Sequence, residues 1–138
     1  MYGDTSALRR RVAQLQLCAD EVRDRARLLV QQAESMEWAS AAGDALRGQI
    51  RVSAHALGIQ ATLLDTAAEC LAKHIRAVEA LKEAIFVAQQ AALSLWDRVT
   101  EFVANGAEVP RLFAVPPPLG SKDWLDIRND FARRGWAP

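Results

Sequence analysis

Apolar residues recur near the N-terminus of the chain at steps that alternate between four and three residues. The row consists of Leu8, Val12, Leu15, Ala19, Val22, Ala26, Leu29, Ala33 and Met36. A repeat of about 3.5 residues keeps one face of an α-helix apolar over its whole length. The row therefore predicts a helix over about residues 5–36, for which Asp4, Thr5 or Ser6 is a suitable N-cap.

The same alternation restarts at Leu46 and continues to Phe102. The second row consists of Leu46, Ile50, Ser53, Leu57, Gln60, Leu64, Ala67, Leu71, His74, Val78, Leu81, Ile85, Ala88, Ala92, Leu95, Val99 and Phe102. It predicts a second helix over about 44–105, and Asn105-Gly106 is a typical helix stop. Gly58 is a point at which this helix can bend.

Three members of the second row are polar, namely Ser53, Gln60 and His74. Buried polar residues fix the register of packed helices in coiled coils. We expect Ser53 and Gln60 to have this role where the first helix covers the second. His74 is expected to set register or to be partly solvated.

Small residues around a single tryptophan separate the two rows. This tip, residues 37–43, joins the helices, and Ser40 is a candidate N-cap for the second one. Asp44 then lies in the first turn, where a negative charge meets the positive end of the helix. The predicted fold is all-α: an antiparallel helical hairpin over 1–106 with a long second helix.

The second helix is about 60 residues long and the first about 32, so at ~1.5 Å per residue the first covers only half of the second. From Lys73 to Phe102 an apolar face lacks a partner within the hairpin. A second copy, a different helical protein or the chain's own tail can cover it. The candidate contact residues on this face are Val78, Leu81, Ile85, Leu95, Val99 and Phe102.

The tail, residues 107–138, begins as a loop with Pro110 and Pro116-Pro117-Pro118, which is stiff and extended. A short amphipathic helix follows. Its apolar residues Trp124, Ile127 and Phe131 recur at helical spacing on one face. We expect this segment to dock, either on the uncovered face of the second helix or on a partner protein.

Charge gives no sign of a nucleic-acid or lipid partner. The chain has 138 residues, with 17 basic and 17 acidic side chains that also balance locally, so it has no basic stripe. The longest uncharged run, Ala84 to Trp96, is too short to span a bilayer. No secretory signal peptide is recognisable at the N-terminus.

Cys18 and Cys70 are the only cysteines. Folding the chain about residue ~40 puts Cys18 opposite residue ~62, which is ~12 Å along the helix from Cys70 and too far for a disulfide. We expect two small, buried or half-buried thiols.

The sequence has no recognisable catalytic, metal or cofactor motif. Neither His55 nor His74 has a glutamate three residues before it, as the metal sites of four-helix bundles require. No glycine-rich loop follows a strand, and two packed helices offer no concave pocket for a catalytic triad. We therefore expect no enzymatic activity, no cofactor, no metal and no small-molecule substrate.

The segment from Trp38 to Arg47, with Ser40 and Gly43 inside it, resembles the tip of the WXG100 family of ESAT-6-like proteins. Together with the two amphipathic helices, the resemblance covers residues ~5–100 and is nearest to the actinobacterial variants with a Trp-x-Ser tip. It implies a helical hairpin that dimerises into a four-helix bundle. Trp38, Ser40 and Gly43 are the binding residues that it implies at the tip.

The resemblance also implies export by a type VII secretion system, from the cytoplasm and without a cleaved leader, as partner or adaptor of another protein. That partner is a second copy, another WXG100-like protein or an effector. The family pairs its tip tryptophan with a Tyr-x-x-x-Asp/Glu motif after the second helix. Tyr2 is the only tyrosine here, so a partner would have to supply that motif. The alternative is a cytosolic coiled-coil adaptor or chaperone-like subunit.

Overall fold

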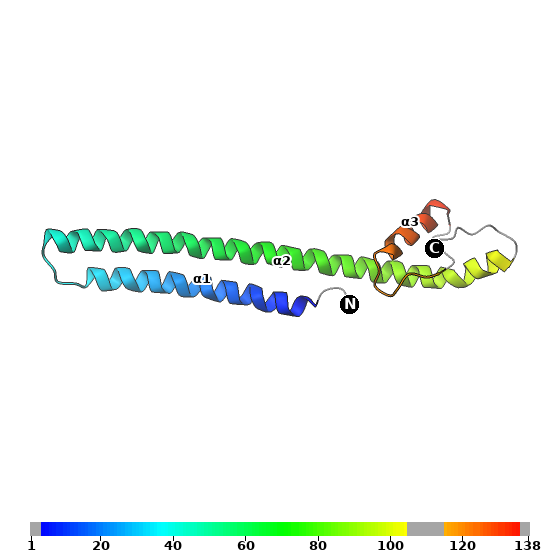
Figure 1. The fold of residues 1–138 in the computed structure, drawn as a ribbon, viewed down its shortest axis with the longest axis horizontal. Helices are drawn as coiled ribbons and strands as arrows, with labels where there is room; N and C mark the ends of the chain where they lie inside the picture. The colour runs from blue at the N-terminus through cyan, green and yellow to red at the C-terminus, as the bar shows by residue number, and fades with distance from the viewer. Residues whose placement is uncertain (1–3, 105–114, 136–138) are drawn as a thin grey trace. The chain divides into compact units, whose positions relative to one another are not determined.

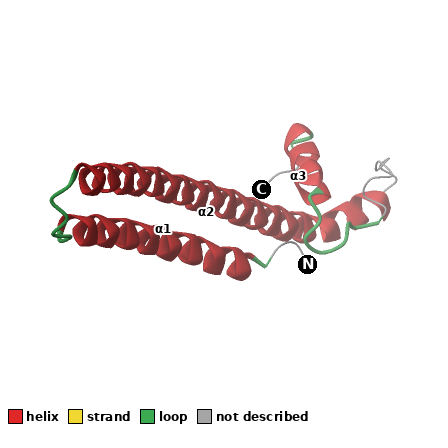
Figure 2. Cartoon of the chain, turned by 60° about the vertical axis from the view of Figure 1, so that its left-hand side comes forward, coloured by secondary structure: helices red, strands yellow, loops and turns green. Residues whose placement is uncertain are grey.

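The chain folds into three helices in a computed structural model that describes residues 4–104 and 115–135. They are α1 (Thr5–Glu34), α2 (Ala41–Ala104) and α3 (Asp123–Arg133). No strand occurs in these described stretches, so the predicted all-α class is confirmed (Figures 1 and 2). The structure divides into two compact units, Thr5–Ile75 and a C-terminal unit that starts at Arg76.

The helix ends lie close to the predicted ones. The first helix stops at Glu34, two residues before the predicted end, and α2 begins at Ala41, three residues before its predicted start. α2 passes Gly58 without interruption. The first part of the predicted loop over 107–120, residues 107–114, lies outside the described residues, and so do the side chains from Trp96 to Ala104, including those of Val99 and Phe102.

Alanines spaced by seven residues form the contact between α1 and the first part of α2. The buried hydrophobic residues of the unit Thr5–Ile75 are Ala19, Ala26 and Ala33 on α1, and Ala54, Ala61, Ala68 and Ile75 on α2. Figures 1 and 2 show the two helices side by side and running in opposite directions. Side chains as small as alanine let the two backbones approach closely, and the spacing of seven keeps them on one face.

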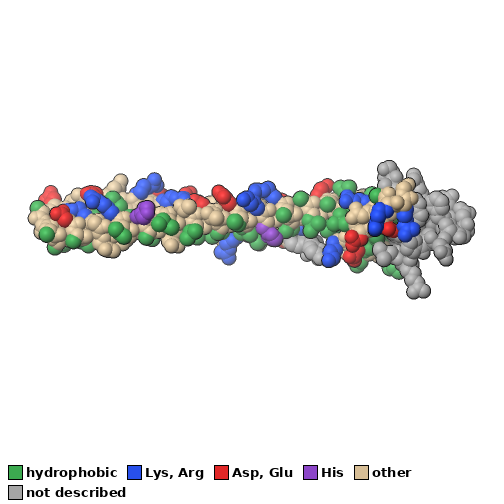
Figure 3. Space-filling model, turned by 90° about the horizontal axis from the view of Figure 1, so that it is seen from above, with side chains coloured by type: hydrophobic (Ala, Val, Ile, Leu, Met, Phe, Trp, Pro, Cys, Tyr) green, Lys and Arg blue, Asp and Glu red, His purple; other side chains and the backbone are tan. Residues whose placement is uncertain are grey.

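The buried row on α2 lies one residue further along the chain than the sequence pattern predicts. Ser53, Gln60 and His74 are exposed, whereas Ala54, Ala61 and Ile75 beside them are buried. Figure 3 shows histidine side chains at the surface. The expectation that Ser53 and Gln60 are buried register-setting residues is therefore wrong.

The physical reason is a rotation of α2 by about 100°, the angle between successive residues of a helix. Centring the alanines on α1 brings the helices closer than centring longer side chains would. The larger apolar residues then flank the contact and are half-buried. They are Ile50, Leu57, Leu64 and Leu71.

Ion pairs accompany the alanine contact at two levels. Arg23 of α1 pairs with Asp65 of α2, and Nε of Arg51 donates to Oε1 of Glu34 at 2.8 Å. The hydrogen bond to Asp65 is the main cause that raises the pKa of Arg23 above its ordinary value. These pairs supply polar contacts between the two helices at their exposed edges.

The two cysteines differ from expectation because both thiols are exposed. Arg23 of α1 pairs with Asp65 of α2. Cys18 lies five residues before Arg23 and Cys70 lies five residues after Asp65, so the antiparallel helices place the two cysteines at about the same level. Both are free. Cys70 comes two residues after the buried Ala68, which turns it away from α1. The different directions of the side chains, and not axial separation, keep the thiols apart.

Candidate interaction site

The tip between α1 and α2 is organised by the first turn of α2. Ser40 caps the helix: its Oγ accepts a hydrogen bond from the backbone N–H of Gly43 at 3.1 Å. Its carbonyl accepts from the N–H of Asp44 at 3.0 Å. Asp44 lies in the first turn of α2. Both predictions for the start of this helix, the Ser40 cap and the position of Asp44, are confirmed.

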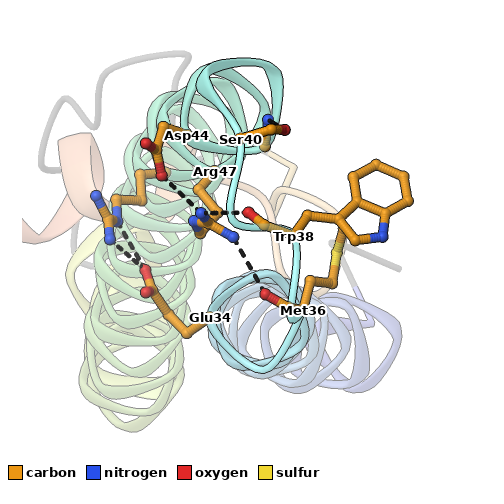
Figure 4. Close-up of polar contacts among 8 residues, drawn as sticks. Glu34, Met36, Trp38, Ser40, Asp44 and Arg47 are labelled. Atoms are coloured by element: carbon orange, nitrogen blue, oxygen red, sulfur yellow. Dashed lines mark hydrogen bonds and ion pairs between the residues drawn. The ribbon is translucent and has the colours of Figure 1, made fainter.

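Arg47 connects α2 to the backbone of the tip. Its guanidinium donates to the carbonyl oxygen of Met36 at 3.2 Å, to that of Trp38 at 3.0 Å, and to Oδ1 of Asp44 at 2.6 Å. Figure 4 shows these contacts converging on one side chain. Only 16% of the Arg47 side chain is exposed. A charged donor that binds two carbonyls and a carboxylate fixes the path of residues 36–38.

Gly43 is required by the closeness of the tip to α2. A Cβ atom at this position would lie 2.6 Å from the carbonyl oxygen of Trp38 and 3.0 Å from its Cβ. Any side chain would therefore push the Trp38 backbone away from the helix. The glycine and Arg47 thus act on the same peptide group, one by leaving room for it and the other by binding it.

The side chain of Trp38 itself points outward and is 61% exposed. In Figure 4 the indole extends away from both helices, while its backbone carbonyl faces Arg47. An indole contributes a large apolar surface and one N–H donor, and aromatic side chains of this kind are enriched at protein interfaces. Trp38 is therefore an apolar contact point held on a well-bonded backbone.

A glycine substitution tests this account of the tip. We expect Gly43→Ala to lower the free energy of unfolding by about 1 kcal/mol, because the added methyl group overlaps the Trp38 carbonyl. The matched control is Gly48→Ala, where nothing lies within 4 Å of the added Cβ. It should stabilise by about 0.5–1 kcal/mol, since alanine favours helix. Urea denaturation followed by circular dichroism measures both, and equal effects would contradict the steric account.

The C-terminal unit contains most of the other predicted contact residues, and it packs several of them against one another. Trp124, Ile127 and Phe131 of α3 are buried in one cluster with four residues of α2. The α2 residues are Ile85, Ala88, Ala92 and Leu95. Of the two docking targets considered for the tail, the chain's own second helix is the one occupied. Whether any of these residues also binds a partner stays a prediction.

Polar contacts hold the segment before α3 against α2. Nε1 of Trp124 donates to the carbonyl oxygen of Pro118 at 3.0 Å. The N–H of Gly120, whose φ of 80° suits glycine, donates to Oε1 of the buried Gln89 at 3.1 Å. The pattern of apolar residues gives no sign of the role of Gln89.

Beside this segment an apolar groove of about 790 Å³ opens between α2 and residues 118–121. Val78, Leu81 and Phe86 lie on its α2 side. Leu81 and Phe86 are exposed, and Val78 is half-buried. Of the predicted contact residues with described side chains, Val78 and Leu81 thus stay accessible outside the α3 cluster.

The described residues contain no group of three or more His, Cys, Asp or Glu side chains that could hold a metal ion. Within the same stretches, none of the helices combines the length and the hydropathy needed to cross a bilayer. No protein-family model, no curated protein and no solved structure matches the chain. The assignment of a role therefore depends on the residues and their geometry.

Proposed function

We propose that this chain is an ESAT-6-like helical-hairpin protein associated with type VII secretion. In this proposal it is a co-exported partner or adaptor that dimerises through helix–helix contacts and catalyses no reaction. It would be made in the cytoplasm and leave without a cleaved signal peptide. Its partner would be a second copy, another WXG100-like protein or a helical effector.

The observation that carries the proposal is the exposed side chain of Trp38, whose backbone is held by Arg47 and packed closely against Gly43. An indole that only closed the end of an apolar contact would be buried against it, yet 61% of this residue meets solvent. Arg47 and Gly43 hold the peptide group of Trp38 without engaging its ring. Such an arrangement suits recognition by another protein, which is the role that the resemblance implies for this tryptophan.

Substitution of the tryptophan tests the proposed role. We expect Trp38→Ala to abolish either the export of a tagged chain or the binding of its partner. The free energy of unfolding should change by less than about 0.5 kcal/mol. The small stability effect is expected because the ring is largely exposed. The measurements are fractionation of cells with an active type VII machinery and urea denaturation of the purified variant. Leu17→Ala, another exposed apolar truncation, serves as the control and should leave export intact.

The second candidate is a cytosolic coiled-coil adaptor or chaperone-like subunit, which would have no need of the Tyr-x-x-x-Asp/Glu motif that residues 1–138 lack. Fractionation separates the two. A wild-type chain that stays in the cytoplasm while known substrates are exported contradicts the exported-partner proposal and leaves the adaptor. A Trp38→Ala variant that is exported normally but melts at a much lower temperature would show that the tip is structural.

A further inference from the structure

The face of α2 that points away from α1 carries an apolar stripe of its own. We call it the outer stripe; it consists of Ala45, Gln49, Val52, Ala56, Ile59, Leu63, Thr66 and Cys70. Its steps also alternate between four and three residues. Val52 and Ile59 each precede a buried alanine by two positions, about 200° around the helix, so they lie nearly opposite the contact with α1. Val52, Ile59 and Leu63 are all at least half exposed.

The outer stripe lies in a part of α2 that is almost free of charge. Between Val52 and Ala68 the only charged residue is Asp65, and it pairs with Arg23 of α1. Arg47 and Arg51, just before this stretch, are bound to the tip and to Glu34.

The outer face of α1 serves as an internal comparison. At the corresponding positions, two residues before or after each buried alanine, α1 carries Leu17, Glu21, Asp24, Leu28 and Gln31. Two charged residues separate the exposed leucines of this face, whereas the outer stripe of α2 contains no charged residue. A solvated helix face normally looks like that of α1, whereas an apolar stripe with helical period needs a covering surface. The difference indicates that the outer face of α2 is an interface.

The order of residues in the outer stripe is self-complementary when it is read against its own reverse. We propose that it binds the same stripe of a second copy, with the two α2 helices antiparallel and the two-fold axis between Leu57 and Gly58. Val52 then faces the partner's Leu63, and Ala56 faces the partner's Ile59. Gln49 faces the partner's Thr66, and Ala45 faces the partner's Cys70. In the first two pairs both side chains are apolar, in the third both are polar, and in the fourth both are small. Packed antiparallel helices require such matching.

The residues that flank the stripe fit this pairing because they avoid like charges. Near the axis, the two edges of the stripe are formed by Ser53, His55, Gln60 and Thr62. None of these four residues is Lys, Arg, Asp or Glu. Like charges near a two-fold axis would repel their own copies. Residues 45–70 extend over about 38 Å, which is enough for more than three heptads of contact. The inference rests on the dimerisation in the proposed function and does not require export.

Purified full-length protein tests the interface. We expect the wild-type chain to sediment as a dimer and Ile59→Glu to weaken the dimer at least ~100-fold, because the glutamate would be buried without a partner. Leu17→Glu places the same charge at a 69% exposed position on the outer face of α1 and should leave the dimer intact. Circular dichroism should show unchanged helicity in both variants. A monomeric wild type at high micromolar concentration, or an Ile59→Glu variant that stays dimeric, would overturn the proposal.

Disulfide trapping tests the orientation. In a Cys18→Ser, Cys70→Ser background, the pair Val52→Cys with Leu63→Cys should oxidise to a covalent dimer. The two positions lie about 16 Å apart along one helix and cannot bond within a chain. Val52→Cys alone should not cross-link, whereas parallel, in-register helices would cross-link it efficiently and contradict the antiparallel arrangement. Both tests use purified protein and do not depend on export. A chain that dimerises in this way but is not exported would contradict only the proposed export, and a chain that is exported without this dimer would contradict only this inference.

Discussion

Replacement of Trp124 by alanine is expected to undock α3 and to lower the free energy of unfolding of the C-terminal unit by about 3–5 kcal/mol. The indole is 1% exposed and shares a cluster with Ile127 and Phe131 of its own helix. Its removal also breaks the hydrogen bond to Pro118. An 11-residue helix has little stability without such packing, so α3 should lose its structure when it detaches.

Limited proteolysis measures this effect directly. Cleavage within 115–135 should become much faster in Trp124→Ala than in the wild type, because the undocked segment is accessible to the protease. Detachment would also uncover Ile85, Ala88 and Ala92, so the variant should associate more readily at high concentration. Trp38→Ala removes an equal side chain from an exposed position and should not change the cleavage rate. Equal protection of Trp124→Ala and wild type would contradict the role given to this cluster.

The second large effect is expected in the alanine contact between α1 and α2. Ala68→Leu should lower the free energy of unfolding by about 3 kcal/mol, because three further heavy atoms must enter a contact that is built for alanine. Ala68 is 1% exposed. The neighbouring Ala67 is exposed, so Ala67→Leu should change the stability by less than about 0.5 kcal/mol.

This pair of variants differs by one position and distinguishes the two rotations of α2. If the row predicted from the sequence were the buried one, leucine at 67 would be the disruptive substitution and leucine at 68 the tolerated one. Chemical denaturation followed by circular dichroism gives both free energies under the same conditions. The result is independent of any partner when it is measured well below the concentration at which the chain associates.

The sequence predicts the helices well because each apolar pattern is long and keeps a regular period. An alternation of four and three residues that persists from Leu8 to Met36 has few explanations other than a helix. The start of α2 is also predictable, since a Ser40 cap with an acidic residue in the next turn is a local signal. The buried face of α3 follows in the same way from the spacing of Trp124, Ile127 and Phe131.

The rotation of α2 could not be predicted by the same reasoning. More than one apolar row runs along this helix, and hydropathy favours the row that contains more leucine. The structure instead buries the alanine row, because close approach of two backbones depends on small size more than on hydropathy. A search for small residues at intervals of seven, such as Ala54, Ala61 and Ala68, would have found it.

The contacts of Arg47 could not be predicted either. Sequence reasoning places this arginine within the tip motif, but two of its three partners are backbone carbonyls, which carry no sequence signal. The same holds for Gln89, whose bond goes to the N–H of Gly120. Side chains that bind the main chain of a distant turn are visible only in the folded molecule.

The contacts of Arg47 have a consequence for how the tip can vary. The guanidinium binds the carbonyls of Met36 and Trp38, and Gly43 makes room for the same peptide group, so neither depends on the ring at position 38. The turn should accept leucine, tyrosine or lysine there with its shape preserved. A single substitution at position 38 can therefore change which side chain contacts a binding protein, while the backbone of the tip keeps its conformation.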